Sequence, residues 1–171
     1  MLIGILSDTH DNIRAADEAV RLFNQMGVSV VIHAGDWCAP FTLLRFKGCK
    51  AKVRGALGNN DGEQLGLLET AEKLGFELGH LIDFMAGPIR VAVLHGTDER
   101  IVRALAKSGE YGLVVRGHTH ETGYEKIGDC LIVNPGEACG YLTGKRTVAI
   151  LDADAMKVTF HELEVATPHI V

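Results

Sequence analysis

The stretch LIGILSDTHDNIRAADEAVRLFNQMGVSVVIHAGD (residues 2–36) decides the fold class, because it has the pattern of a strand, a helix and a second strand. Gly27 ends the helical pattern, as glycine commonly does after the last turn. The alternation continues beyond this stretch, and the predicted elements of the first third are strands over 2–7, 28–33 and 51–57 and helices over 12–27 and 40–46. This order indicates parallel strands joined by crossover helices.

The rest of the chain continues the alternation and then changes character. The predicted helices cover 62–75 and 99–109, and the predicted strands cover 90–95 and 111–117. From about Thr122 the pattern is one of short strands, which we expect to pair antiparallel and to contain no helix of any length. We therefore expect an α/β protein with two sheets and helices packed outside them, formed by a single domain over 1–164 and followed by a tail over 165–171.

Composition excludes several classes of protein. The 171 residues include 47% hydrophobic and 23% charged residues, which is ordinary for a globular domain. A net charge of −5 argues against strong unspecific binding to nucleic acid. No apolar stretch reaches the roughly 18–20 residues of a membrane span, and the N-terminus lacks the basic region of a signal peptide. The four cysteines are scattered without a paired motif, so we expect a cytoplasmic protein with reduced thiols and no membrane partner. The oligomeric state stays open, with a homo-oligomer as one alternative.

Polar residues that can bind a metal follow five of the predicted strands. They are Asp8 and His10 after the first strand, Asp36 after the second, Asn59 after the third, His95 at the end of the fourth, and His118 and His120 after the fifth. The carboxyl ends of strands in an open α/β sheet meet at one crevice, where ligands bind. We therefore expect these seven side chains to lie together.

The spacing and the chemistry of these residues favour a site with two metal ions. Asp8 and His10 form an i,i+2 pair, as do His118 and His120, so each pair presents two side chains to the same side of an extended backbone. Seven ligands exceed the needs of one ion and suffice for two that share a bridging carboxylate. Imidazole, carboxylate and amide ligands suit manganese, iron, zinc or nickel better than calcium or magnesium.

Each motif alone has a simpler structural interpretation. Asp8 is placed to cap the helix that begins near Asn12, and the sequence ALGNNDGE (56–63), which contains Asn59, has ordinary turn chemistry. A single histidine is more often a buried residue whose ring nitrogens are hydrogen-bonded within the protein than a metal ligand. What favours a metal site is that all of these residues follow strands that point to one edge.

The motifs, taken in order, resemble the calcineurin-like metallophosphoesterase family, and in particular its small single-domain archaeal and bacterial phosphodiesterases. They are SDTHDN (7–12), HAGD (33–36), GNND (58–61), LHG (94–96), GHTH (117–120) and NPGEACGYLTG (134–144). The resemblance covers residues 1 to about 164. It implies a four-layer αββα sandwich in which two mixed β-sheets are flanked by helices, with a site for two metal ions at the sheet edges.

The resemblance also implies the ligands and the reaction. Asp8, His10 and His120 would hold one ion, Asn59, His95 and His118 would hold the other, and Asp36 would bridge them. The cofactors would be two divalent transition-metal ions, with Mn2+ favoured and Ni2+, Fe2+ or Zn2+ as alternatives. A hydroxide that bridges the two ions would attack a phosphate diester, and the partner would be a small phosphodiester substrate.

One position departs from the family pattern. Many members have histidine in the third place of GNND, where it is thought to protonate the leaving group, and this chain has Asn60. An amide donates a hydrogen bond but delivers no proton at neutral pH, although the substrate, Asp61 or a metal-bound water could supply one. We expect Asp36, Asn60 and His95 to act in catalysis. His33 and Glu137 either orient the ligands or are buried for structural reasons.

Two other functions compete with a phosphodiesterase. A retromer subunit of the same fold is a scaffold for protein interactions with a degraded metal site, whereas the ligand set here is intact. A nuclease, like the related DNA-repair phosphoesterases, is disfavoured by the acidic net charge.

Overall fold

The computed structural model describes residues 1–164, and the tail expected over 165–171 lies outside the described residues. The strands form two sheets, with the orders β11-β10-β1-β2-β3-β4 and β5-β6-β7-β9-β8. The six-stranded sheet comprises β1 (Leu2–Leu6), β2 (Val30–His33), β3 (Lys52–Ala56), β4 (Glu77–Gly79), β10 (Thr147–Asp152) and β11 (Lys157–Glu162). The five-stranded sheet comprises β5 (Leu81–Ala86), β6 (Ile89–Leu94), β7 (Leu113–Val115), β8 (Thr122–Ile127) and β9 (Cys130–Pro135).

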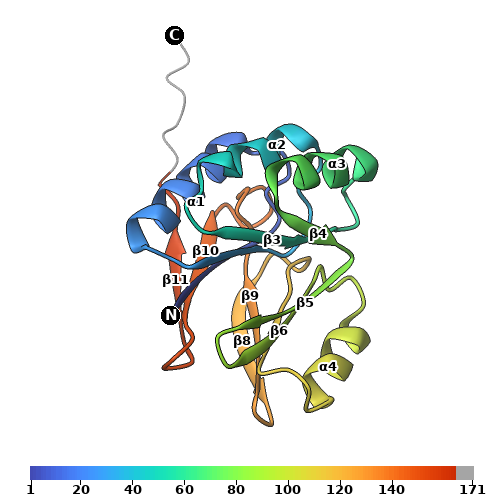
Figure 1. Cartoon of the computed structure of the whole chain (residues 1–171), viewed down its shortest axis with the longest axis vertical. Helices are drawn as coiled ribbons and strands as arrows, with labels where there is room; N and C mark the ends of the chain where they lie inside the picture. The colour runs from blue at the N-terminus through green and yellow to red at the C-terminus, as the bar shows by residue number, and fades with distance from the viewer. Residues whose placement is uncertain (165–171) are drawn as a thin grey trace.

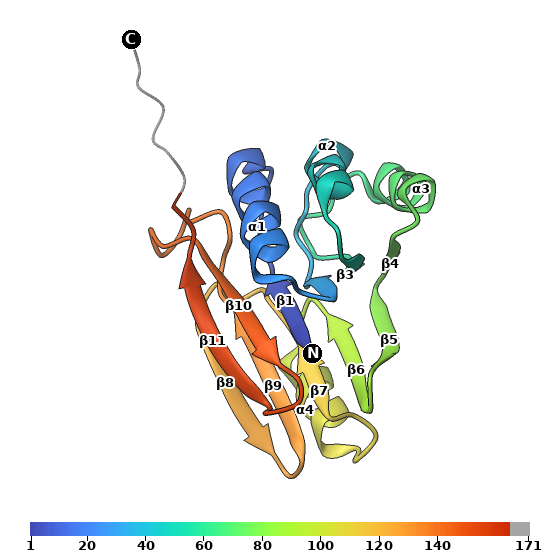
Figure 2. The ribbon, with the colours of Figure 1, turned by 60° about the vertical axis from the view of Figure 1, so that its left-hand side comes forward.

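Helices cover the outer faces of both sheets (Figures 1 and 2). The six-stranded sheet is covered by α1 (Ile13–Met26), α2 (Pro40–Leu44) and α3 (Gln64–Leu74), and the five-stranded sheet by α4 (Glu99–Lys107). The expected four-layer arrangement of two mixed sheets flanked by helices is therefore confirmed.

Both sheets are mixed, and the expectation that the late strands pair antiparallel is confirmed except for one pairing of β9. The strands β1, β2 and β3 are parallel, as predicted, and β10 pairs antiparallel with β1. Of the late strands, β8 pairs antiparallel with β9 and β10 with β11, but β9 runs parallel to β7. The strand β9 is buried along its whole length, as is typical of a strand paired on both sides inside a covered sheet.

The local sequence explains where α1 begins and ends. The Asn12 side chain accepts a hydrogen bond from the backbone N–H of Ala15, which satisfies one of the free donors of the first turn. Gly27 ends the helix with left-handed backbone, at a φ of 66°. A Cβ atom at Gly4 would lie 2.7 Å from the Phe23 ring, so glycine at this point of β1 lets α1 pack directly on the sheet.

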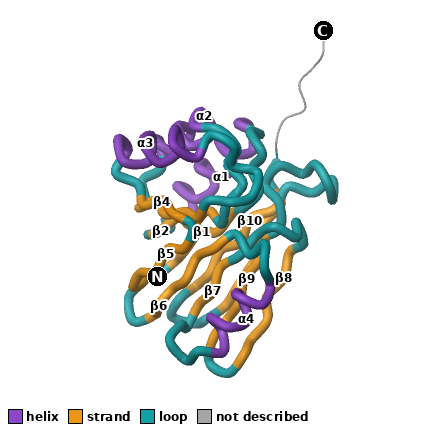
Figure 3. The backbone as a smooth tube through the Cα atoms, turned by 90° about the vertical axis from the view of Figure 1, so that its right-hand side faces the viewer, coloured by secondary structure: helices purple, strands orange, loops and turns teal. Residues whose placement is uncertain are grey.

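Apolar side chains fill the space between the sheets. These buried side chains include Ile3, Ile5, Ile32 and Leu151 from one sheet and Ile82, Phe84, Val91, Val93, Leu113, Val115, Leu131 and Val133 from the other. Burial on this scale stabilises the fold by about 25 cal/mol per Å2 of apolar surface removed from water. This core fixes both sheets, so that the loops after their parallel strands meet on one side, as Figure 3 shows in teal. No helix within residues 1–164 has the length and apolarity needed to cross a membrane.

Candidate metal centre

The structure brings all seven predicted ligands to one edge of the two sheets. Backbone hydrogen bonds between the loops hold them there, because the Asp8 N–H donates to the Gly35 carbonyl at 3.0 Å and the His10 N–H donates to the Asp36 carbonyl at 3.1 Å. The Gly117 N–H donates to the His95 carbonyl at 2.9 Å and connects the loops of the second sheet.

Five of the seven residues have left-handed backbone, which residues other than glycine adopt infrequently. Their φ angles are 54° for Asp8, 41° for His10, 60° for Asp36, 70° for His118 and 62° for His120. Such conformations cost on the order of 1–3 kcal/mol each and gather at functional sites. The expectation of extended backbone across the two i,i+2 pairs was therefore wrong in detail, although both members of each pair still reach the same cluster.

The centre of the cluster is formed by two carboxylates and the Nε2 atoms of three histidines. The Asp8 Oδ1 atom lies 3.3 Å from the His120 Nε2 atom and 3.7 Å from that of His10. The Asp36 Oδ2 atom lies 3.2 Å from the His95 Nε2 atom and 3.5 Å from that of His10. Ligands that surround a transition metal at about 2.0–2.2 Å have roughly this separation from one another.

The hydrogen bonding of these atoms fits a bound cation. Asp8 Oδ1, His10 Nε2 and His95 Nε2 are buried, and they have no hydrogen-bond partner among the described residues. A buried polar atom without a partner costs about 1–3 kcal/mol, so three that meet at one point indicate a site built for a ligand. Two oxygens and three imidazoles are the donor set of a divalent transition metal.

Asn59 and His118 form a second group beside this centre. The His118 Nδ1 atom lies 3.0 Å from Asn59 Oδ1, and the His118 ring lies edge-on to the His95 ring with 5.2 Å between centroids. The His118 N–H donates to Asp8 Oδ2 at 3.1 Å, which joins the two groups. Asn59 is exposed and His118 half-buried, so this side of the site is open to solvent.

The second ring nitrogen of two central histidines is held by an acceptor. The Nδ1 atom of His95 lies 2.8 Å from the Ala34 carbonyl, and that of His120 lies 2.7 Å from Glu137 Oε2. A carbonyl and a carboxylate can only accept, so both Nδ1 atoms carry the proton and both Nε2 lone pairs remain free to bind a metal.

Electrostatics in the centre favour a cation. Burial alone would raise the pKa of Asp36, but the approach of the His95 ring to 3.2 Å and the two hydrogen bonds from Asn60 lower it far below its usual range. The Asp8 carboxylate, 3.7 Å from Nε2, raises the pKa of His10. Burial lowers the pKa of His95, yet its contact with Asp36 outweighs this effect and raises it. The more exposed His118 has a pKa lowered by partial burial. The two carboxylates therefore attract positive charge, which a proton or a metal ion can supply.

His33 supports the loops and does not face the cluster. Its Nδ1 atom accepts from the Gly35 N–H at 3.2 Å, so Nε2 donates to Thr9 Oγ1 at 3.0 Å. The Thr9 hydroxyl in turn donates to the Asp36 carbonyl at 3.3 Å. Burial lowers the pKa of His33 well below its ordinary value, so the ring is neutral. This chain of bonds connects the backbone between Asp8 and His10 to that of Asp36.

Asp61, the last residue of GNND, also holds the loops together. It is buried, and its two oxygens accept the backbone N–H groups of Cys38 at 2.7 Å and Gly58 at 2.6 Å. Burial raises the pKa of Asp61 above its ordinary value. Since both oxygens accept hydrogen bonds from the backbone, we interpret Asp61 as a residue that connects the loop after Asp36 with the loop that carries Asn59, and not as a proton donor.

Sequence reasoning missed two cysteines at this site. The Cys139 sulfur lies within 4.8 Å of the ligand atoms of His10 and His120. The Cys38 sulfur lies 3.7 Å from His10 Nδ1. Burial raises the pKa of each thiol to about 12, so both are uncharged. Cys139 follows Glu137 by two residues in NPGEAC, and this proximity was the one signal in the sequence.

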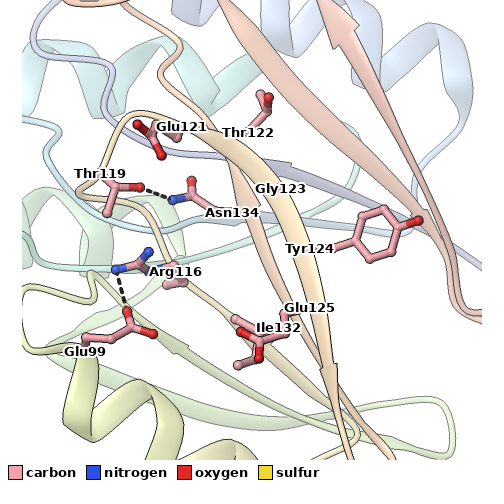
Figure 4. A pocket seen from close by; sticks show the side chains of 10 residues that line it. All are labelled: Glu99, Arg116, Thr119, Glu121, Thr122, Gly123, Tyr124, Glu125, Ile132 and Asn134. Atoms are coloured by element: carbon pink, nitrogen blue, oxygen red, sulfur yellow. Dashed lines mark hydrogen bonds and ion pairs between the residues drawn. The ribbon is translucent and has the colours of Figure 1, made fainter.

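A pocket of about 220 Å3 lies beside the GHTH loop (Figure 4). Its lining includes Thr119, whose hydroxyl accepts a hydrogen bond from the Asn134 amide at 2.8 Å. None of the seven predicted ligands lines it. The residue between the two histidines of this loop therefore faces the pocket, whereas the histidines reach the carboxylates.

Comparisons with known proteins agree with this geometry. The family model described as calcineurin-like phosphoesterase superfamily domain matches residues 1–156. The chain is 38% identical over 156 residues to a protein of Methanocaldococcus jannaschii named as a phosphodiesterase, covering 90% of this chain and 94% of the relative. A solved structure described as a novel archaeal phosphodiesterase matches with a TM-score of 0.92 at 36% identity, over 95% of this chain and 100% of that one. Vps29 from Chaetomium thermophilum matches with a TM-score of 0.69 at 16% identity over 95% of each chain, a likeness of fold alone.

Proposed function

Because the chain belongs to the calcineurin-like phosphoesterase superfamily, we propose that it is a metal-dependent phosphodiesterase whose loop cluster holds two divalent ions. The observation that carries the proposal is the convergence of Asp8 Oδ1, His10 Nε2 and His95 Nε2, which are buried and have no other partner within residues 1–164. The names of the archaeal relatives, at 38% and 36% identity, support the reaction class.

The assignment of ligands follows the two groups in the cluster. In this proposal Asp8, His10 and His120 hold one ion, and Asn59, His95 and His118 hold the other. Asp36 bridges them, which is supported by its position between His10 and His95, at 3.5 and 3.2 Å. When bound, two such ions activate a water molecule and neutralise charge on the phosphoryl oxygens.

The residues of the chain prepare the site for this chemistry. Ala34 and Glu137 keep the protons of His95 and His120 on Nδ1, so that Nε2 faces inward. Asn60 keeps Asp36 ionised and oriented with two hydrogen bonds. The open side near Asn59 and His118 admits the substrate, for which we propose a small phosphodiester.

The finer assignments belong to the same proposal. We favour Mn2+ for both positions, with Ni2+, Fe2+ or Zn2+ as alternatives, since the donors are nitrogen and oxygen and both nearby thiols are protonated. We place the protein in the cytoplasm, which is supported by four cysteines that are free over residues 1–164. A scaffold like the retromer subunit is disfavoured, because that neighbour is only 16% identical and a scaffold has no need of a complete ligand set.

The test is metal removal followed by reconstitution. Chelator-treated protein should bind no divalent metal and should not cleave bis(p-nitrophenyl) phosphate, and added Mn2+ should restore both properties. Elemental analysis of the reconstituted protein should give two ions per chain. Full activity in the metal-free protein would refute the proposal.

A further inference from the structure

Glu137 is a buried carboxylate that is shared between a ligand histidine and a loop. Its side chain is fully buried, and Oε2 lies 2.7 Å from the Nδ1 atom of His120. The remaining donors all come from the loop that follows it, and they are Cys139 Sγ, the backbone N–H groups of Tyr141, Leu142 and Thr143, and the Thr143 hydroxyl. Over residues 1–164 its one ion-pair partner is His120.

His120 differs from the other histidines of the centre in this contact. The Nδ1 atom of His95 meets a backbone carbonyl, that of His118 meets a side-chain amide, and that of His10 is 3.7 Å from a thiol. Only His120 meets a carboxylate, and a hydrogen bond to an ionised acceptor is roughly twice as strong as one between neutral groups. The outer contact of His120 is therefore the strongest of the four.

The contact with Glu137 also orients the His120 ring. With its Nδ1 proton held by Glu137, the His120 ring turns Nε2 to within 3.3 Å of Asp8 Oδ1. A carboxylate behind a metal-bound imidazole fixes the ring and makes it a more basic ligand. Building on the proposed function, we propose that Glu137 is a positioning residue, which fixes the orientation and tautomer of His120 and thereby strengthens metal binding at the site that Asp8 and His10 complete.

A purely structural role is the alternative to be tested. The Oε1 atom of Glu137 accepts only from the loop, including the Thr143 hydroxyl at 2.7 Å. A loop anchor would contribute through these bonds alone. Thr143→Val removes one of them and leaves the bond between Oε2 and His120 intact, so it is the matched control for Glu137→Gln.

The experiment is a double-mutant cycle with Mn2+ affinity as the readout, measured by competition with a chelator. Glu137→Gln should weaken Mn2+ binding about 10–100-fold, as the loss of such an outer contact typically does. In the His120→Ala background the same substitution should have no further effect, because Glu137 acts through that ring. Thr143→Val should lower thermal stability while Mn2+ affinity stays within about twofold. Equal weakening in both backgrounds, or in Thr143→Val, would overturn the proposal.

A second measurement needs no substitution and so does not depend on whether Glu137→Gln folds. Nitrogen NMR of histidine-labelled, metal-free protein at alkaline pH should show His120 protonated at Nδ1 and bare at Nε2. The opposite tautomer would overturn the proposal.

Neither readout uses a phosphodiester. A protein that shows the expected Mn2+ affinities but cleaves no diester would refute the proposed function alone. A protein that binds none of Mn2+, Ni2+, Fe2+ and Zn2+ would refute both.

Discussion

Asn60 holds both carboxylate oxygens of Asp36. Its backbone N–H donates to Oδ1 and its side-chain amide donates to Oδ2, each at 2.8 Å. The residue in the place of the usual family histidine therefore contacts the carboxylate proposed to bridge the ions. This contact adds a positioning role to the catalytic role expected for Asn60. A substitution at this position should therefore change the orientation of Asp36 as well as protonation of the leaving group.

The first prediction concerns Asn60→His, which restores the commoner motif. General acid catalysis contributes about 10²–10⁴-fold, and most for leaving groups that need a proton. We therefore expect kcat/KM to rise for alkyl phosphodiesters and to change much less for nitrophenyl esters, whose leaving group departs without help. The measurement is kcat/KM for both substrate types in both proteins.

Metal content has to be equal in the two proteins, because the substitution also removes the amide that binds Asp36 Oδ2. Asn60→Ala is the control, since it removes the same bond without adding an acid. An equal change on both substrate types would show that residue 60 does not govern protonation of the leaving group.

The second prediction is that Asp36→Ala causes the largest loss among single ligand substitutions. A bridging carboxylate serves both ions, so elemental analysis should find neither of them retained. His118→Ala, on the open side of the site, should chiefly empty one position. Asp129→Ala, which makes the same chemical change at an exposed position, should keep both ions. Two ions bound to Asp36→Ala would contradict the bridging role.

The third prediction concerns a close approach between loops. A Cβ atom added at Gly58 would collide with the Asp36 backbone nitrogen and Oδ1. Gly58→Ala should therefore displace Asp36, weaken metal binding and destabilise the fold by about 1–3 kcal/mol. A Cβ atom added at Gly62, four residues later, would have no neighbouring atom within 4 Å, so Gly62→Ala should leave metal content and stability unchanged. Chemical denaturation and metal analysis of the two variants make the comparison, and equal behaviour would argue against this steric requirement.

The fourth prediction concerns Asp61→Asn. Asp61 now accepts one hydrogen bond from the backbone N–H of Cys38 and one from that of Gly58. Asparagine replaces one of the two carboxylate oxygens with an NH2 group, which is a donor, so one of these N–H groups would lose its acceptor. Leaving a buried donor unpaired costs about 1–3 kcal/mol, so the free energy of unfolding should fall by that amount. Asp129→Asn provides the exposed control. If Asp61 were instead the proton donor, Asp61→Asn would abolish turnover of alkyl esters while stability stayed unchanged.

Much of the fold could be predicted from the sequence, because its first half has strong periodicity. The strands β1, β2 and β3 and the helix α1 lie within two residues of their predicted bounds. The strands β4 and β5 were not predicted. The former has only three residues. The latter alternates buried and exposed residues between Gly79 and Gly87, a pattern typical of a strand that sequence reasoning overlooked. The parallel pairing of β9 with β7 joins segments of one sheet that are distant in sequence, and it leaves no local pattern.

The convergence of the seven predicted ligands was predictable because each of them lies at the end of a strand whose direction the pattern gives. The supporting residues were not, since they reach the site through contacts distant in sequence. The Ala138 and Cys139 N–H groups donate to the Ser7 and Asp8 carbonyls, and these bonds bring Glu137 beneath His120. Nothing local to residues 136–144 indicates such pairing, so the sequence left the role of Glu137 open.

The left-handed backbone at five of the seven predicted ligands has a consequence for how quickly the proposed site would take up metal. These conformations are held by the sheets and by bonds between loops, so they exist before an ion arrives. Binding then requires little reorganisation of the chain and should bury little additional apolar surface. Calorimetry should accordingly record a small heat-capacity change on metal uptake, and association should be limited by the ion's loss of its water shell and not by movement of the loops.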